Sequence, residues 1–303
     1  MPAGALAWSA SSWCSPAPRT SGKRCSSHAT DAASAPERQV DAPPRTASFV
    51  RREIRWGDGP DHVADLHLPK EEGPFTNEHG TPAVMLLHGG FWKQAFDRSL
   101  MTPIAEALAE AGLIVWNVEY RRWRPDDEGV WQETISDVLR AWGHLEGLDG
   151  VDASRTAVIG HSAGGHLALV VAALSERRAK VCVAQAAVSD LVAADAAALS
   201  DGGDAVRRWV GSPVEDQATP WNALNPIGLT PQCPVIFAHG EEDEDVPIAM
   251  SRACAEAYIA RGSTADLVPL PGDHYTIIDP SHECWRSIQE GVLGWLMSGK
   301  SVG

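Results

Sequence analysis

Short apolar runs alternate with amphipathic segments along the chain from about residue 50 onward. A short continuous apolar run is typical of a strand buried on both faces of a sheet, and apolar positions three or four residues apart are typical of a helix packed on one side. The pattern predicts strands at 48–56, 62–68, 83–87, 113–120, 156–159, 180–187, 235–238 and 265–269, and helices at 97–111, 131–145, 164–174, 205–210, 247–261 and 280–297.

This order of elements predicts an α/β domain with a mostly parallel, eight-stranded sheet and helices on both of its faces. Residues 48–56 and 62–68 are separated by a Gly-Asp-Gly turn signal, so we expect them to open the sheet as an antiparallel pair. The alternation breaks at about residues 190–233. We expect this insertion to form a short cap above the carboxyl ends of the strands, where ligands bind in such sheets.

The first 49 residues differ from the rest in composition. More than half of residues 1–50 are Ala, Ser or Pro, and no acidic residue precedes Asp31. Such a segment has too little apolar surface to offset the entropy of ordering. We therefore expect residues 1–49 to be a disordered or non-native extension, with a targeting segment as an open alternative, and residues 50–300 to be the catalytic domain.

Charge and cysteine content exclude several classes of protein. The chain has 25 Lys and Arg against 40 Asp and Glu, a net charge of −15, and shows no basic stripe that would bind nucleic acid. It has no stretch of about 18 apolar residues that could span a membrane. The six cysteines form no CxxC pair, which indicates reduced thiols and a cytoplasmic protein. Neither a metal site nor a nucleotide-binding motif is present, so we predict no metal and no cofactor.

The strongest chemical signal is the pentapeptide Gly160-His161-Ser162-Ala163-Gly164. It lies between an apolar run and a helical run, which is the setting of a nucleophile elbow. The flanking glycines leave room for a serine on a sharp strand-to-helix turn. Ser162 is therefore the predicted nucleophile, the Ala163 N–H is a predicted oxyanion donor, and His161 is a predicted substrate contact.

A serine nucleophile needs a base, and the base needs an acid that orients it. In this kind of fold the acid and then the histidine follow the serine along the chain. The strand at 235–238 runs into an acidic loop, in which Asp243 is our choice and Asp245 the rival. His274 follows the next strand and is the expected base, with His282 as the fallback.

A second glycine motif, His88-Gly89-Gly90-Phe91-Trp92, follows the strand at 83–87. Glycines allow a backbone N–H to approach a developing oxyanion closely. We expect Gly90 and Phe91 to supply such donors, Gly89 and Trp92 to contact substrate, and His88 to anchor the loop by side-chain hydrogen bonds.

Five segments together, HGGFW, VEYR, GHSAGG, HGEEDEDVP and GDHY, resemble the α/β-hydrolase superfamily over about residues 50–300. The resemblance is nearest to the branch of kynurenine formamidases (arylformamidases) and hormone-sensitive-lipase-like carboxylesterases. It implies the α/β-hydrolase fold and a triad of Ser162, Asp243 and His274. The aromatic Phe91 stands where many esterases of this group carry a third glycine, and Arg122-Trp123 replaces the usual Leu-Ala after Tyr-Arg.

The function we predict is that of a serine hydrolase that cleaves small carboxylic esters or aryl formamides, with a small acyl or aryl-formamide molecule as its partner. A prolyl-oligopeptidase-type exopeptidase is the second hypothesis, although no repeat indicates the separate propeller domain of that class. A non-catalytic binding protein of the same fold is the third, although such a protein would be expected to have lost a triad member. Monomer and homodimer both stay open.

Overall fold

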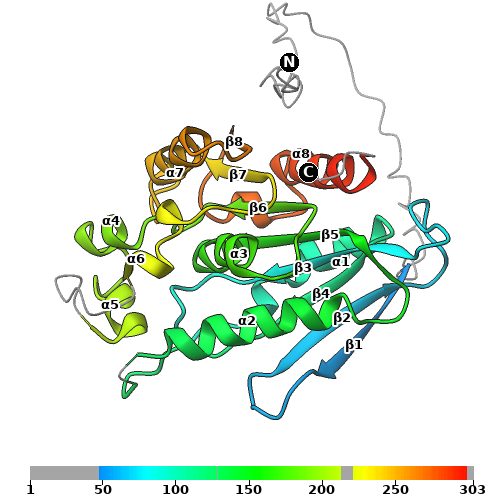
Figure 1. The fold of residues 1–303 in the computed structure, drawn as a ribbon, viewed down its shortest axis with the longest axis horizontal. Helices are drawn as coiled ribbons and strands as arrows, with labels where there is room; N and C mark the ends of the chain where they lie inside the picture. Colours follow the sequence, from blue (N-terminus) through cyan, green and yellow to red (C-terminus); the bar gives the residue numbers. More distant parts are fainter. Residues whose placement is uncertain (1–47, 128, 213–220, 299–303) are drawn as a thin grey trace, which may run out of the picture. The chain divides into compact units, whose positions relative to one another are not determined.

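The computed structural model describes residues 48–127, 129–212 and 221–298 of the chain (Figure 1). The predicted extension at residues 1–49 therefore lies outside the described residues, except for its last two positions.

The described residues form the predicted eight-stranded sheet, with the strand order β1-β2-β4-β3-β5-β6-β7-β8. β1 pairs antiparallel with β2, as the turn signal predicts, and β2 pairs antiparallel with β4. All other neighbours are parallel, which confirms the mostly parallel sheet. The strands are β1 (Phe49–Arg55), β2 (Val63–Pro69), β3 (Thr81–Leu87), β4 (Ile114–Val118), β5 (Val151–His161), β6 (Val181–Gln185), β7 (Val235–Gly240) and β8 (Ala265–Leu270).

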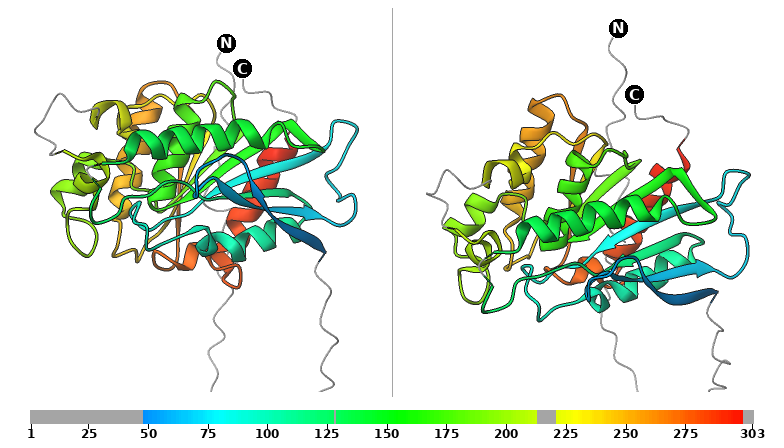
Figure 2. Two further views of the ribbon diagram at one scale, coloured as in Figure 1. Left: turned by 90° about the horizontal axis from the view of Figure 1, so that it is seen from below. Right: turned by 60° about the horizontal axis from the view of Figure 1, so that its bottom comes forward.

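Helices cover both faces of this sheet. Figure 2 shows α2 on one face and α8 on the opposite face. β3, β4, β6 and β7 are buried along most of their length, in agreement with their continuous apolar sequences. The α-helices are α1 (Thr102–Glu110), α2 (Trp131–Leu145), α3 (Ala163–Leu174), α4 (Leu191–Ala196), α5 (Ala205–Val210), α6 (Trp221–Leu224), α7 (Ile248–Ala260) and α8 (Glu283–Met297), and the 3₁₀ turns are η2 (Arg98–Met101), η3 (Pro226–Gly228) and η4 (Thr276–Ile278).

Three elements differ most from the sequence-based expectation, and the shortest of them is the unpredicted four-residue helix α6. Helix α4 is not predicted, because six residues are too few to show a helical period. Its one local signal is Asp190, whose side chain accepts hydrogen bonds from Val192 N and Ala193 N as an N-cap. Strand β5 begins at Val151, earlier than expected, where Val151 pairs with Thr81 across an irregularity in the β3–β5 register.

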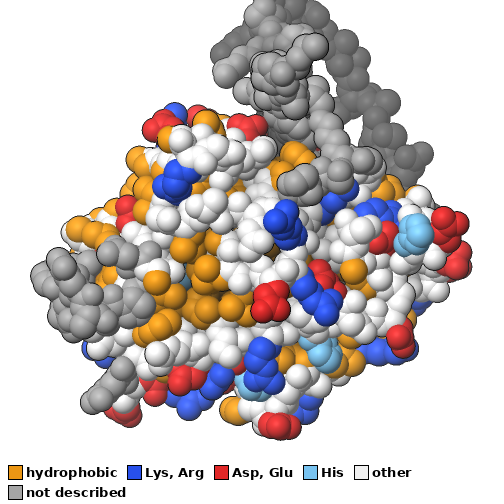
Figure 3. All heavy atoms as spheres, viewed as in Figure 1, with side chains coloured by type: hydrophobic (Ala, Val, Ile, Leu, Met, Phe, Trp, Pro, Cys, Tyr) orange, Lys and Arg blue, Asp and Glu red, His pale blue; other side chains and the backbone are white. Residues whose placement is uncertain are grey.

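The described part of the insertion after β6 contains α4, α5, α6 and η3. Figure 1 shows its helices gathered together at one end of the sheet. In Figure 3, hydrophobic side chains gather around the place of α3, and Leu174 at the end of α3 is 45% exposed. Among the described helices, none is both long and apolar enough to cross a membrane.

Candidate active site

Ser162 occupies the sharp turn between β5 and α3. Its backbone angles, φ 57° and ψ −119°, are strained for a residue with a Cβ. The glycines on either side make the turn possible: a Cβ on Gly160 would lie 2.0 Å from the Gly164 carbonyl oxygen, and one on Gly164 would lie 2.1 Å from that of Leu87. The sequence Gly-x-Ser-x-Gly therefore folds as an elbow because larger residues at either glycine would collide with backbone.

Asp243 and His274 are brought together from the loops that follow β7 and β8. Asp243 Oδ2 accepts a hydrogen bond from His274 Nδ1 at 2.7 Å, and the Asp243 side chain is fully buried. Asp243 Oδ1 accepts from the backbone N–H groups of Asp245 and Val246. His239 Nε2 lies 3.2 Å from Asp243 Oδ2. Four N–H groups thus surround the carboxylate and fix its orientation.

These contacts set the charge state of Asp243. Burial alone raises the pKa of this carboxyl, but hydrogen bonds from His239 and His274 outweigh it and hold the pKa well below its usual range. Asp243 is therefore ionised at neutral pH. The rival Asp245 is exposed and contacts Asp243 through its backbone, and the fallback His282 caps the start of α8.

Ser162 and His274 line one cavity, but no hydrogen bond joins the Ser162 hydroxyl to His274 within the described residues. Such contacts are often long in the absence of substrate. His161, next to the serine at the end of β5, links this turn to the loop after β8, because its Nε2 donates to the His274 carbonyl oxygen at 2.8 Å. Burial, with the neighbouring His274, lowers the pKa of His161 to about 3, so its ring is neutral.

The loop after β3 approaches the serine closely. A Cβ on Gly89 would lie 2.9 Å from both His161 Nδ1 and the Ser162 Cβ, so only glycine fits there. Gly90 and Phe91 have positive φ values of 107° and 49°. Within the described residues, the N–H groups of Gly90 and Phe91 donate to no protein atom. An oxyanion hole requires N–H donors that are not used by other protein atoms.

The cavity beside Ser162 has a volume of about 360 Å³. Phe91, Phe96 and Tyr275 give it aromatic walls, and Phe96 and Tyr275 are partly exposed. The remaining lining residues are Gly90, Lys93, Leu100, His161, Ser162, Ala198, Leu199, Ser200, Asp201, Glu244, Asp245 and His274. The cavity therefore combines an apolar wall with an acidic rim.

Most of the added lining residues carry no sequence signal. Residues 198–201 lie in the insertion after α4, far in sequence from Ser162, and only the folded chain brings them to the cavity. Phe96 can reach the wall because Gly90 has no side chain: a Cβ on Gly90 would lie 2.4 Å from the Phe96 Cβ. Tyr275 is the exception, since its place next to His274 is a usable signal.

Of the three expected substrate contacts, His161 lines the cavity, whereas Gly89 and Trp92 are not among its lining residues. Trp92 lies farthest from the expectation. It is fully buried and stacks on Trp209, with ring centroids 4.5 Å apart, and it meets the His166 ring edge-on. Phe91 and Trp92 both have positive φ, at 49° and 55°, and of the two only Phe91 lines the cavity, while Trp92 gains burial in the core.

We predict that Trp92→Ala lowers the free energy of unfolding by about 3–5 kcal/mol, because it leaves a cavity beside Trp209. Urea unfolding followed by circular dichroism measures this change. Trp92→Phe keeps an aromatic ring in the stack and should cost less than half as much. Equal losses for the two variants would contradict the packing role.

One group of described residues places ligand-type atoms close enough for a metal ion. Single atoms of Asp243, Asp245 and His274 lie within 4.8 Å of one another. Asp243 Oδ2 and His274 Nδ1 already bond to each other, so these atoms are engaged in the pair.

The sheet order and the strand–serine–helix turn define an α/β-hydrolase. The solved structure of a carbohydrate esterase from gut microbiota, in truncated form, superposes with a TM-score of 0.68 at 18% identity and covers 84% of this chain and 99% of its own. Esterase B from Lactobacillus rhamnosis gives a TM-score of 0.67 at 19% identity over 82% of this chain and 85% of its own. The predicted fold is therefore confirmed.

The model of the protein family BD-FAE matches residues 64–258, which is more than half of the chain. The chain belongs to the BD-FAE family of α/β-hydrolase esterases. The isoprenylcysteine alpha-carbonyl methylesterase of Arabidopsis thaliana is 25% identical over 255 residues, which cover 75% of this chain and 56% of that protein. The kynurenine formamidase of Salmo salar is 26% identical over 122 residues, which cover 39% of this chain and 37% of that protein. The chain thus spans little more than half of the former relative and about a third of the latter.

Proposed function

We propose that this protein is a serine esterase that hydrolyses small neutral carboxylic esters through an acyl-enzyme on Ser162. The hydrogen bond of 2.7 Å between Asp243 Oδ2 and His274 Nδ1, beside a cavity lined by Ser162 and His274, carries the proposal. An acid–histidine pair next to a serine on a strained turn is the arrangement that acyl transfer needs.

In the proposed mechanism, the Ser162 hydroxyl attacks the ester carbonyl while His274 Nε2 takes its proton. Asp243 keeps the Nδ1 proton in place and stabilises the imidazolium that forms. The N–H groups of Gly90, Phe91 and Ala163 would hold the oxyanion. His274 then gives its proton to the leaving alcohol, and a water molecule, activated by the same histidine, releases the acid.

The cavity supports a small, neutral acyl group. Its volume of about 360 Å³ lies near the lower end for small-molecule sites. Asp201, Glu244 and Asp245 line it against a single lysine, Lys93. The Lys93 Nζ lies 3.7 Å from Asp201 Oδ2, so an acid already offsets its charge. The rim is therefore net negative and should repel an anionic substrate.

We predict that p-nitrophenyl butyrate is hydrolysed with a kcat/KM roughly ten times or more that of mono-p-nitrophenyl succinate. The two esters have acyl chains of equal length and differ by one carboxylate, which the acidic rim repels. Initial rates measured at low ionic strength give this ratio, and added salt should reduce it.

Glu244→Gln is the matched variant for this test, because Glu244 lines the cavity and has no assigned chemical role. This variant should lower the ratio of the kcat/KM values for the two esters and leave kcat/KM for the butyrate ester nearly constant. An equal kcat/KM for both esters in the unmodified protein would overturn the proposed preference.

Aryl formamides are the second candidate substrates. The aromatic wall of Phe91, Phe96 and Tyr275 supports them, as does the similarity to a kynurenine formamidase. Parallel assays of N-formyl-kynurenine and p-nitrophenyl butyrate distinguish the candidates. A higher kcat/KM for the formamide would move the assignment from esterase to formamidase with the same proposed triad.

A further inference from the structure

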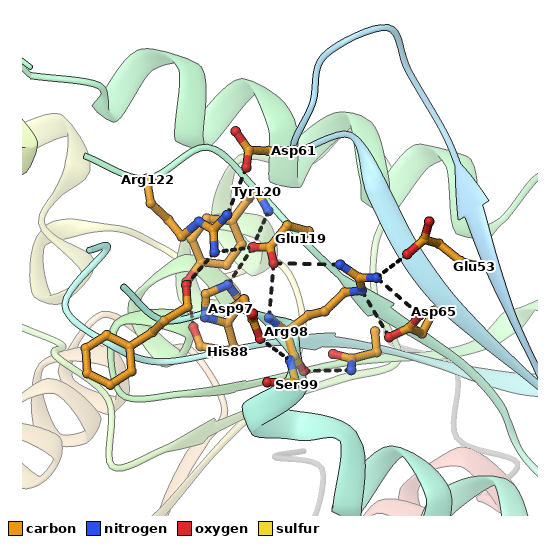
Figure 4. A network of polar contacts seen from close by, with 12 residues as sticks. Glu53, Asp61, Asp65, His88, Asp97, Arg98, Ser99, Glu119, Tyr120 and Arg122 are labelled. Atoms are coloured by element: carbon orange, nitrogen blue, oxygen red, sulfur yellow. Dashed lines mark hydrogen bonds and ion pairs between the residues drawn. The ribbon is translucent and has the colours of Figure 1, made fainter. Parts of the chain in front are cut away.

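A buried polar network lies behind the glycine loop, and its centre is Glu119 (Figure 4). Glu119 follows β4 and is 3% exposed. Its carboxylate accepts from the backbone N–H of Arg98 at 3.1 Å and of Tyr120 at 3.2 Å, and it lies 2.9 Å from Arg122 Nη1. These three groups can only donate, so both carboxylate oxygens must offer lone pairs. Three donors, one of them the Arg122 guanidinium, therefore favour the carboxylate form of Glu119.

His88 is the fourth group on this carboxylate. Its Nε2 lies 2.9 Å from Glu119 Oε1, and its Nδ1 lies 2.7 Å from the carbonyl oxygen of Gly89. A carboxylate and a carbonyl can only accept, so each ring nitrogen must carry a proton. These two contacts fit a ring that carries both protons, and the fully buried His88 ring stacks on the Tyr120 ring with centroids 4.4 Å apart.

The charged groups around His88 come from two segments. Glu119 and Arg122 approach from the end of β4, and Asp97 and Arg98 from the turn before α1. Arg122 is also held by Asp61 at 2.8 Å. Glu119 is the group in direct contact with the His88 ring nitrogen, so it contributes most to keeping both protons on the ring.

The position of the His88 ring fixes the peptide planes of the loop. In a trans peptide the C=O and the next N–H point in opposite directions. Because the Gly89 carbonyl is held by His88 Nδ1, the Gly90 N–H must point away from the ring. The Gly90 carbonyl accepts from Lys93 N at 2.9 Å, which fixes the Phe91 N–H in the same way. Tyr120 holds the preceding carbonyl, that of His88, through its hydroxyl at 2.6 Å.

We propose that Glu119 and His88 are positioning residues for the oxyanion hole: Glu119 keeps the His88 ring doubly protonated, and the ring thereby aims the Gly90 N–H at the reacting carbonyl oxygen. This inference rests on the proposed esterase function. It adds a charged pair that touches no substrate and acts through the backbone of the loop.

Glu119→Gln tests the proposal. The amide cannot stabilise an imidazolium, so His88 loses one proton and its hold on the Gly89 carbonyl weakens. We expect kcat for p-nitrophenyl butyrate to fall roughly 10- to 100-fold, which is no more than the fall expected when a whole oxyanion donor is removed. KM should change less than about threefold. Circular dichroism must show a folded variant.

Asp65→Asn is the matched control. Asp65 is also a buried carboxylate of this network, pairing with Arg98 and Arg51, but it does not contact His88. It should lower stability and leave kcat in place. If Asp65→Asn lowers kcat as much as Glu119→Gln, the effect is merely structural and the proposal fails.

Nitrogen-15 NMR of the histidine rings reads the protonation directly and needs no variant that might unfold. We expect His88, assigned by its absence in His88→Asn, to show two protonated nitrogens at pH 8 in the unmodified protein. A neutral ring at that pH would overturn the inference, whether or not the esterase proposal holds. Conversely, a chain without ester turnover and without fluorophosphonate labelling of Ser162 would overturn the proposed function and leave the NMR result standing.

Discussion

Replacing Ser162 with alanine is expected to lower kcat for p-nitrophenyl butyrate by roughly 10⁴- to 10⁶-fold. The proposed mechanism has one nucleophile, and the serine hydroxyl is the group that forms the acyl-enzyme. Alanine keeps the Cβ, so the strained backbone at φ 57° is no worse in the variant than in the unmodified protein. The loss is therefore chemical, and initial-rate measurements against the same folded concentration quantify it.

Ser189→Ala is the control for this experiment. Ser189 is likewise fully buried, and its hydroxyl donates to the Met250 carbonyl oxygen away from the cavity. It should cost about 1 kcal/mol of stability and leave turnover in place. Fluorophosphonate labelling should disappear in Ser162→Ala and persist in Ser189→Ala. Retained turnover or labelling in a folded Ser162→Ala protein would sink the proposed function.

The second large effect is expected for Asp243→Asn, which should reduce kcat roughly 10³- to 10⁴-fold. An asparagine turned to offer its amide nitrogen favours the wrong tautomer of His274, so Nε2 no longer accepts the serine proton. The backbone N–H groups of Asp245 and Val246 would still find an acceptor in the amide oxygen. The fold should therefore survive, and kcat should fall far more than KM rises.

Asp245→Asn separates the two acids of this loop. Its side chain is exposed, and among the described residues no hydrogen bond joins it to His274, so kcat for the butyrate ester should change no more than about threefold. The reverse result, with Asp245→Asn the damaging change, would reassign the acid.

The charge of Asp243 also links stability to pH. Because its pKa is lowered in the folded protein, the stabilisation is present above the pKa of the unfolded chain and is lost as pH falls through the acid range.

The sequence predicted the elements of the fold closely where the apolar period was long enough to read. Helix α2 and helix α5 have the predicted bounds, and all eight strands are present. Helix α4 is missed because six Ala-rich residues carry no period. The fold as a class could be predicted because short continuous apolar runs that alternate with helical segments are typical of a buried parallel sheet.

The candidate site was predictable in part. Ser162, Asp243 and His274 were selected by chain order and by their place after strands, and the structure brings Asp243 and His274 into contact. Trp92 was expected at the cavity and lies in the core instead. Glu119 was not selected, although it stands within the quoted VEYR segment, because nothing in the sequence tells that its carboxylate meets His88.

By itself, then, the sequence determined the local geometry. The sharp turn at Ser162 needs small residues next to the serine, and these residues are close neighbours in the sequence. The tertiary structure brings the predicted acid to His274, and it alone decided which segments wall the cavity and which group holds the glycine loop. These contacts join residues about 30 or more positions apart. Strand order and burial determine which residues form these contacts, because a buried charge is stable only where several donors or acceptors converge on it.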